Sequence, residues 1–174
     1  MTILSDSDLR KALKSGEIKI APKPSDACIG SGSIDVALSG TFYVGKKSVK
    51  KGVIRDLSKT DFTDVYDKVK RDSLVLMPGE VVLAVTEEKL TLAPDVCGWI
   101  QGRSRFARLG LTAHVASSFI QPGSSNRQVL EVANLAWFPV RIHKGMRICQ
   151  IVFEKTQTKA SIPYAKRGRP YSKQ

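Results

Sequence analysis

The chain has 174 residues, 42% of them hydrophobic, and a formal net charge of +12. That length is enough for one domain with a substantial core, and the apolar content excludes a disordered chain. The three cysteines form no Cys-x-x-Cys pair, which argues against a disulfide framework and against a cysteine zinc site. The positive charge favours polyanions, either nucleic acid or a substrate with several phosphates, although a solvated basic surface is the alternative.

The chain is predicted to be one domain over residues 1–174, placed in the reducing cytoplasm. No apolar run has the length of a signal peptide core or of a membrane span. A short N-terminal helix is predicted within residues 1–16. Ser5 and Asp8 have the spacing of a capping box, and Gly16 provides the end of the helix.

Short strands are predicted for most of the remaining chain. Residues 33–44 alternate apolar and polar side chains, as a half-buried strand does. Residues 49–72 are the most polar region and are predicted to leave the sheet as a long excursion. Pairs of apolar runs around a turn indicate three hairpins, centred on Pro78-Gly79, Pro94-Asp95 and Lys144-Gly145. Many short strands separated by turns favour a mainly β sandwich or barrel.

The stretch "GRSRFARLGL" interrupts this pattern and predicts a short helix at about 103–109. Arg105 and Arg108 are three residues apart and share a face of such a helix. Arg103 precedes them, and Ser104 is placed to cap the first turn. A helix N-terminus flanked by arginines suits an anion. The alternative is a surface helix with incidental arginines.

Several catalytic signatures are missing from the sequence. The zinc deaminase pattern, the P-loop, the GxSxG elbow and the GxGxxG fingerprint do not occur. His114 and His143 have no partners at metal-ligand spacing, and we interpret both as structural. Hydrolytic chemistry would therefore depend on a carboxylate, a hydroxyl and arginines.

Glu131 is the carboxylate that stands out, because it lies in the nearly apolar stretch "RQVLEVANLAWF". Alternation places Val129, Glu131 and Ala133 on one face of a strand, and neither face is polar. Burying a glutamate is costly unless it is paired or protonated, and a carboxylate in such a place suits a general base. The alternatives are an edge-strand glutamate that faces solvent and a structural Glu–Arg pair.

These motifs together resemble the dCTP deaminases of the dUTPase-like superfamily. The resemblance rests on "GWIQGRSRFARLGLTAHVASSFIQPG", "QVLEVAN" and "GMRICQIVFE", with "ILSDSDL" and "GSIDVALSGTF" before them in the family's order. It implies a distorted jelly-roll β-barrel that assembles as a homotrimer with active sites between subunits. The implied reaction is the zinc-independent hydrolysis of dCTP to dUTP and ammonia, in the synthesis of pyrimidine deoxynucleotides. The implied Mg²⁺ is carried by the substrate triphosphate.

The resemblance also assigns roles to individual residues. Glu131 would take a proton from water and return protons to the cytosine ring and to the leaving amine. Ser104 would hold the water, and Arg108 would orient the cluster. The backbone of residues 114–118 would contact the base. Substrate binding is implied for Arg103, Arg105, Phe106, Ala107, Gln121, Val129, Leu130, Tyr164, Arg169, Tyr171 and Gln174. The last four belong to a basic C-terminal arm, about 155–174, that would close over the nucleotide.

The chain departs from the family pattern at several of these positions. Gln121 stands where the family usually has an aspartate that faces the sugar, and Asn126 replaces a glycine. Arg105 stands where serine is common. Pro170 occupies the place of a lysine in the arm, and Arg169 would supply the displaced charge.

Three functions compete on these observations. Monofunctional dCTP deamination is favoured, with dCTP and other copies of the chain as partners rather than a membrane or nucleic acid. A dUTPase, or a bifunctional deaminase that also cleaves dUTP, would need an acid to activate water for attack on phosphorus, and Gln121 is neutral. A noncatalytic nucleotide sensor or nucleic-acid binder is the third hypothesis, but the joint presence of Ser104, Arg108 and Glu131 favours an enzyme.

Overall fold

The structure is a computed structural model that describes residues 2–49 and 52–167. Helix α1 (Asp6–Ser15) begins and ends as predicted. The Asp8 backbone N–H donates to Ser5 Oγ (3.3 Å), and the Ser5 backbone N–H donates to Asp8 Oδ2 (3.4 Å), which completes the capping box. Gly16 adopts the left-handed conformation (φ +81°) that ends the helix.

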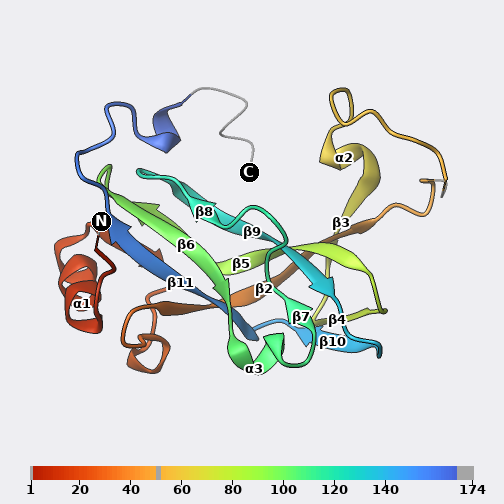
Figure 1. Cartoon of the computed structure of the whole chain (residues 1–174), viewed down its shortest axis with the longest axis horizontal. Helices are drawn as coiled ribbons and strands as arrows, with labels where there is room; N and C mark the ends of the chain where they lie inside the picture. Colours follow the sequence, from red (N-terminus) through yellow and green to blue (C-terminus); the bar gives the residue numbers. More distant parts are fainter. Residues whose placement is uncertain (1, 50–51, 168–174) are drawn as a thin grey trace.

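The described residues form a mainly β fold, as predicted. Its strands are β1 (Ile18–Ala21), β2 (Ile34–Gly45), β3 (Tyr66–Lys70), β4 (Ser73–Leu76), β5 (Val81–Leu92), β6 (Val96–Gly102), β7 (Leu111–Thr112), β8 (Phe119–Ile120), β9 (Ser125–Asn134), β10 (Val140–His143) and β11 (Arg147–Lys155). The main sheet is antiparallel with the order β7-β9-β5-β2-β11-β6-β8, and β1 and β3 pair with β5 and β2. This sheet curls into a half-barrel (Figure 1), and β10 and β4 form a second small sheet.

The three predicted hairpins are wrong, although their turns and strands are present. β4 pairs with β10 rather than with β5 across Pro78-Gly79. β5 pairs with β9, β2 and β1, whereas β6 pairs with β11 and β8. The Pro94-Asp95 turn therefore joins two strands that do not pair with each other. β10 and β11 likewise separate after Lys144-Gly145. Turn residues fix where the chain reverses, but burial of the apolar faces decides which strands pair.

The polar region 49–72 only partly leaves the sheet. It contains the short helix α2 (Phe62–Val65), but β3 follows at once and pairs with β2 along its whole length. Tyr43 lies opposite Lys68 in this pairing, and Thr41 lies opposite Lys70. The excursion therefore ends earlier than predicted, because β3 pairs with β2 and its Val69 packs against the core.

The core lies on the concave side of the curled sheet, between the main sheet, α1 and the β4–β10 pair (Figure 1). β2 contributes Ile34, Val36, Leu38 and Phe42 from alternate positions, as residues on one face of a strand do. β9 follows the same rule between Gln128 and Val132: Gln128, Leu130 and Val132 are buried, whereas Val129 and Glu131 are half-buried on the other face. That second face of β9 carries the candidate site.

Candidate active site

Glu131 lies near the middle of β9, opposite Leu83 of β5. Its neighbours Leu130 and Val132 are buried in the core, whereas Val129 and Glu131 are half-buried on the opposite face. Although neither face of this strand is polar in sequence, the face of Glu131 is covered only in part, by a loop. A ligand can therefore reach the Glu131 carboxylate without any rearrangement of the core.

The loop that covers Glu131 is residues 113–118, between β7 and β8. Three successive backbone N–H groups donate to Glu131 Oε2: Val115 (3.0 Å), Ala116 (3.3 Å) and Ser117 (3.3 Å). Within the described part of the chain, no donor reaches Oε1. The backbone amides fix the carboxylate through one oxygen and leave the other oxygen for a ligand.

A cleft of about 490 Å³ opens over this face of β9. It is lined by Glu131, the predicted catalytic residue, and by three residues predicted to bind the substrate: Gln121, Val129 and Tyr164. Tyr43 and Phe62 line its wall as an edge-to-face pair with ring centroids 5.6 Å apart. Glu131 is the only carboxylate among the described residues of the cleft. The cleft therefore offers apolar and aromatic walls, amide and hydroxyl groups, and one acid.

Tyr164 reaches the cleft because its segment packs against the turn before β9. It begins the short helix η2 (Tyr164–Lys166), and its backbone N–H donates to the Pro122 carbonyl (3.0 Å). Gly123 has φ +75°, and a Cβ there would lie 2.5 Å from Pro163 Cβ. Glycine at position 123 is thus what allows the C-terminal segment to close onto the cleft.

Helix α3 (Ser104–Ala107) forms within the predicted range 103–109, but Ser104 does not cap it. The N-cap residue is Arg103, and no side chain caps the helix. The Arg103 guanidinium instead pairs with Asp35 of β2 (3.0 Å) and donates to the Arg147 carbonyl (3.0 Å). These bonds fix the start of α3 to the sheet and occupy the side chain that was predicted to bind phosphate.

The other α3 residues lie at the far edge of the molecule from the cleft. Ser104, Arg105, Ala107 and Arg108 are exposed and do not line the cleft, whereas Phe106 packs against the core. Figure 1 shows α3 (green) beside β7 at the lower edge, while η2 (blue) lies at the upper edge. Within one subunit, the structure thus separates Ser104 and Arg108 from Glu131.

The remaining predicted residues divide into two groups. Leu130 is buried in the core, so its side chain does not reach the cleft. Arg169, Tyr171 and Gln174 lie outside the described residues. His143 is exposed, and His114 is half-buried with its Nδ1 buried and without a hydrogen-bond partner. Residues 2–49 and 52–167 contain no cluster of three histidine, cysteine or acidic side chains that could hold a metal ion.

Two elements of the site were not predicted from the sequence. In the aromatic pair, Tyr43 belongs to β2 and Phe62 begins α2, so their contact depends on how these two elements pack. Asp35, the partner of Arg103, sits in "GSIDVAL", where strand alternation marks it only as half-buried. A half-buried acid in an otherwise apolar strand was the available signal for Asp35.

Cys149, which is buried, and Glu88, which is half-buried, have shifted pKa values. Burial raises the pKa of the Cys149 thiol to about 12, with Glu88 and Asp35 adding to the shift, so this thiol stays protonated at neutral pH. Burial also raises the pKa of Glu88 above its ordinary value, although the Ala37 backbone N–H donates to its Oε2 (2.9 Å) and opposes the shift. All three cysteines of the chain are free thiols.

Solved structures with this fold identify its class. The crystal structure of 2′-deoxycytidine 5′-triphosphate deaminase from Agrobacterium tumefaciens superposes with a TM-score of 0.67 at 23% identity over 87% of this chain. This chain spans about half (46%) of that protein's length. The dUTPase of phage phi11 of Staphylococcus aureus gives a TM-score of 0.55 at 12% identity, over 82% of this chain and 93% of its own. At these identities the likeness establishes the dUTPase-like fold alone.

Sequence comparisons identify the family within that fold. Residues 3–156 match the model of the dCTP deaminase-like family. The dUMP-forming dCTP deaminase of Methanopyrus kandleri is 35% identical over 98% of this chain and 91% of its own length. The dCTP deaminase of Thermomicrobium roseum is 37% identical over 99% of this chain and 89% of its own. The chain belongs to the dCTP deaminase-like family, as its motifs indicated. No helix in the described residues is long and apolar enough to cross a membrane.

Proposed function

We propose that this protein is an enzyme that hydrolyses dCTP to dUTP and ammonia. One observation carries the proposal: Glu131, whose carboxylate is fixed by three backbone amides, lines a cleft walled by apolar, amide and hydroxyl groups. The proposal is supported by full-length relatives that are dCTP deaminases at 35–37% identity.

Glu131 acts as the proton carrier in this proposal. Water loses a proton to the carboxylate and adds through its oxygen to C4 of the cytosine ring. Glu131 passes this proton to N3. It then takes the proton of the new C4 hydroxyl and delivers it to the amine, so that the C4–N bond breaks as the C4=O bond forms, and the products are dUTP and ammonia. A positioned carboxylate of this kind contributes about 10²- to 10⁴-fold to the rate. The side chains of Gln121 and Tyr164 lie where they would contact the rest of the nucleotide.

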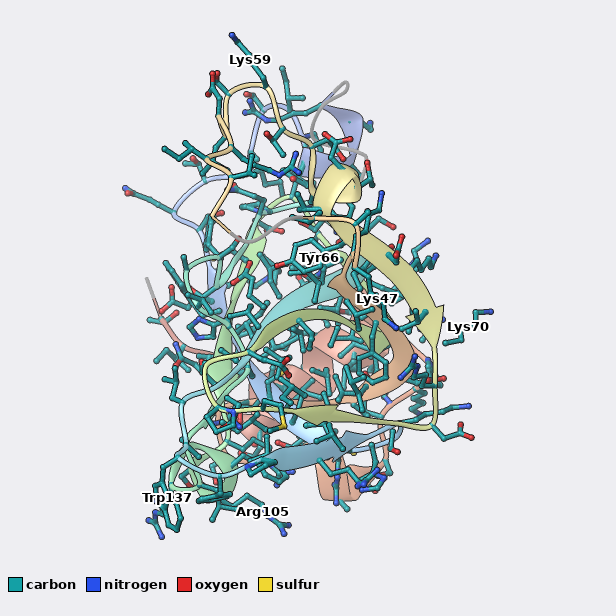
Figure 2. The ribbon with its side chains drawn as sticks, turned by 90° about the vertical axis from the view of Figure 1, so that its right-hand side faces the viewer. Lys47, Lys59, Tyr66, Lys70, Arg105 and Trp137 are labelled. Atoms are coloured by element: carbon teal, nitrogen blue, oxygen red, sulfur yellow. The ribbon has the colours of Figure 1, made fainter. Side chains whose placement is uncertain are left out.

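Ser104 and Arg108 would enter the site from a neighbouring subunit of a homotrimer. Support comes from their distance from the cleft of their own subunit and from apolar side chains exposed around α3. Leu109, Leu135 and Trp137 are 56%, 73% and 88% exposed. Arg105 and Trp137 project from the same end of the molecule (Figure 2). Apolar groups exposed in this density favour burial against another subunit.

Mg²⁺ belongs to the substrate in this proposal and would be bound by the triphosphate, as is usual for nucleotide enzymes. The reaction itself would need no zinc, because the zinc deaminase signature is missing from the sequence. The three free thiols agree with a cytoplasmic location. The basic C-terminal arm would close over the nucleotide, and Tyr164 is the part of it that already lies in the cleft.

A second candidate, deamination followed by cleavage to dUMP, is favoured by one observation. The relative from Methanopyrus kandleri is a dUMP-forming enzyme, and so is the one from Methanosphaera stadtmanae. The cleft argues against this second step. Cleavage of dUTP requires an acid to activate the water that attacks phosphorus, and the described cleft residues supply only Glu131, with neutral Gln121 nearby.

Product analysis tests both candidates. The purified protein is incubated with dCTP and Mg²⁺, and dCTP, dUTP, dUMP and pyrophosphate are separated by chromatography. We expect dUTP and ammonia in equal amounts, without dUMP and without inhibition by a zinc chelator when Mg²⁺ is replenished. Formation of dUMP would establish the second candidate, and the absence of any turnover of dCTP would refute the proposed enzyme.

A further inference from the structure

A second concave surface lies beside the cleft and carries a concentration of positive charge. This basic groove has a volume of about 840 Å³ and is built on β2, β3, β5, β9 and the adjoining turns. Its charged lining residues are five cations and two acids: Lys68, Lys70, Arg71, Arg127, Lys144, Asp72 and Glu87. Lys68, Lys70 and Arg71 are close together in the sequence, and the fold adds Arg127 and Lys144 from two other segments.

Strand pairing explains why the cations converge on one face. Lys68 and Lys70 are two residues apart on β3 and therefore point to the same side of the sheet. They lie opposite Tyr43 and Thr41 of β2, which line the same groove. Figure 2 shows Lys70 at the end of β3, turned away from the body of the molecule.

A bend in β2 brings in the next two cations. The pairing of β2 with β5 is irregular between Leu38 and Phe42, and Gly40 in this stretch has φ +81°. A Cβ at Gly40 would lie 2.8 Å from the Arg71 carbonyl oxygen and 3.2 Å from Lys144 Cβ. The Arg71 backbone N–H donates to the Gly40 carbonyl (2.9 Å). A bare backbone at position 40 therefore lets Arg71 and Lys144 approach each other across β2.

The two acids of the groove, Asp72 and Glu87, offset only part of its positive charge. The ion pairs formed by the described residues include none of its five cations. All five are exposed, so their charge acts on solvent and on any anion in the groove. One nucleotide triphosphate in the neighbouring cleft would also leave most of the +12 net charge uncompensated.

We propose that the basic groove binds the phosphate backbone of single-stranded nucleic acid. An open groove lined by separated cations suits a chain of phosphates, and binding releases the counterions that the cations otherwise hold. The ring of Tyr43 lies in the wall shared with the cleft, with Lys68 Nζ 5.9 Å from its centroid. An aromatic side chain beside a basic track offers a surface on which an unpaired base stacks, which favours a single strand over a duplex.

This binding goes beyond the proposed deamination and does not depend on it. The test uses fluorescence anisotropy of the full-length protein with a labelled oligothymidylate of about 20 nucleotides, over a series of salt concentrations. The groove variant replaces Lys68, Lys70 and Arg127 with alanine. A charge-matched control replaces Lys14, Lys23 and Lys59, which are exposed and do not line the groove.

We expect the groove variant to bind at least about tenfold more weakly than the wild type. The slope of log affinity against log salt should also fall by about 2, at about 0.7 per lost phosphate contact. The control should keep the wild-type affinity and slope, and all three proteins should deaminate dCTP with the same KM.

Several outcomes would overturn the proposal. The proposal is wrong if the wild type does not bind the oligonucleotide. It is also wrong if the two triple variants lose affinity equally, or if a duplex of the same length binds at least as tightly as the single strand. A rise in the KM for dCTP in the groove variant alone would place the groove in the substrate site instead. Oligonucleotide binding is measured without dCTP, so the binding result can be interpreted even if the protein does not deaminate dCTP.

Discussion

Individual carboxylates in this protein differ in their hydrogen bonds and in their surroundings. Glu131 receives three backbone N–H bonds on one oxygen and faces a cleft, whereas Glu88 receives one from Ala37 and lies among buried groups. Asp35 is held by Arg103. Position in the fold, rather than residue type, therefore separates the acid that a substrate can reach from the acids that support the sheet.

Replacing Glu88 by glutamine should stabilise the protein at neutral pH. Burial raises the pKa of Glu88 above its ordinary value of 4.5, so the folded state binds the proton more tightly than the unfolded state. The stability that this proton contributes is present below that value and is lost as pH rises through the folded pKa. Glutamine still accepts the Ala37 N–H bond without carrying charge. Urea unfolding should show a gain for Glu88→Gln at neutral pH that disappears near about pH 4.

A pH-independent difference between Glu88→Gln and the wild type would contradict this account, because it would place the effect in packing rather than in ionisation. A loss of stability at neutral pH would contradict it more strongly, since it would show that the charged form is favoured in the folded state. Glu154→Gln is a suitable control, because its carboxylate is half-buried and accepts the Trp99 Nε1–H bond (3.3 Å).

At the scale of elements, the turn before β9 connects the C-terminal segment to the cleft. Gly123→Ala should raise the KM for dCTP, because the new Cβ would collide with Pro163 and displace Tyr164. The positive φ adds a cost of about 1–2 kcal/mol to folding. Gly79→Ala is the matched control: Gly79 has φ +78° with nothing within 4 Å of an added Cβ. Unfolding experiments and steady-state kinetics separate the two effects.

Both glycine variants should therefore lose similar stability from backbone strain, whereas only Gly123→Ala should change the KM. An unchanged KM in Gly123→Ala would show that the contact with Pro163 does not hold Tyr164 in the cleft. A raised KM in Gly79→Ala would show that the effect reflects general loosening of the fold.

Elements with local determinants were predictable from the sequence. The capping box at Ser5 and Asp8 fixed α1, and alternation identified β2 and β9. The short helix α3 was predicted, but the prediction that Ser104 caps it was wrong. The N-cap residue is Arg103, whose side chain pairs with Asp35 of β2. Strand pairing was missed for the same reason: partners such as β4 and β10 are far apart along the chain, and their contact depends on how the whole sheet curls.

The candidate site shows the same division. Glu131 was recognisable as an acid in an apolar strand, and Gln121, Val129 and Tyr164 join it in the cleft. The loop amides of residues 115–117 and the Tyr43–Phe62 pair were not predictable, since backbone direction and long-range contacts place them. The basic groove was not predictable either, because only the fold brings Arg127 and Lys144 to Lys68, Lys70 and Arg71.

At the scale of the whole molecule, the separation of α3 from the cleft leads to a complementation experiment. Ser104→Ala and Glu131→Gln should each be inactive as homotrimers. Mixed trimers formed by co-refolding should regain activity, because one subunit supplies Ser104 and its neighbour supplies Glu131. With random assembly in equal amounts, about a quarter of the sites would be intact.

Isolation by two affinity tags removes the inactive homotrimers, and every mixed trimer then has one intact site in three. Activity per site of about one third of the wild-type value would therefore support shared sites. Inactive mixed trimers, with trimerisation shown by light scattering, would mean that both residues act within one subunit or that one of them has no catalytic role. Mixing without refolding is the control, since it tests for exchange between trimers.

In the proposed reaction Glu131 carries the protons of dCTP deamination, and the variant Glu131→Gln removes that capacity. The variant keeps the shape of the side chain and an oxygen for the amides of Val115, Ala116 and Ser117, but it cannot take a proton from water. The measurement is the rate of ammonia and dUTP release from saturating dCTP, beside Glu154→Gln. We predict a loss of at least about 10²-fold for Glu131→Gln alone. Near wild-type turnover by a folded Glu131→Gln protein would contradict the account.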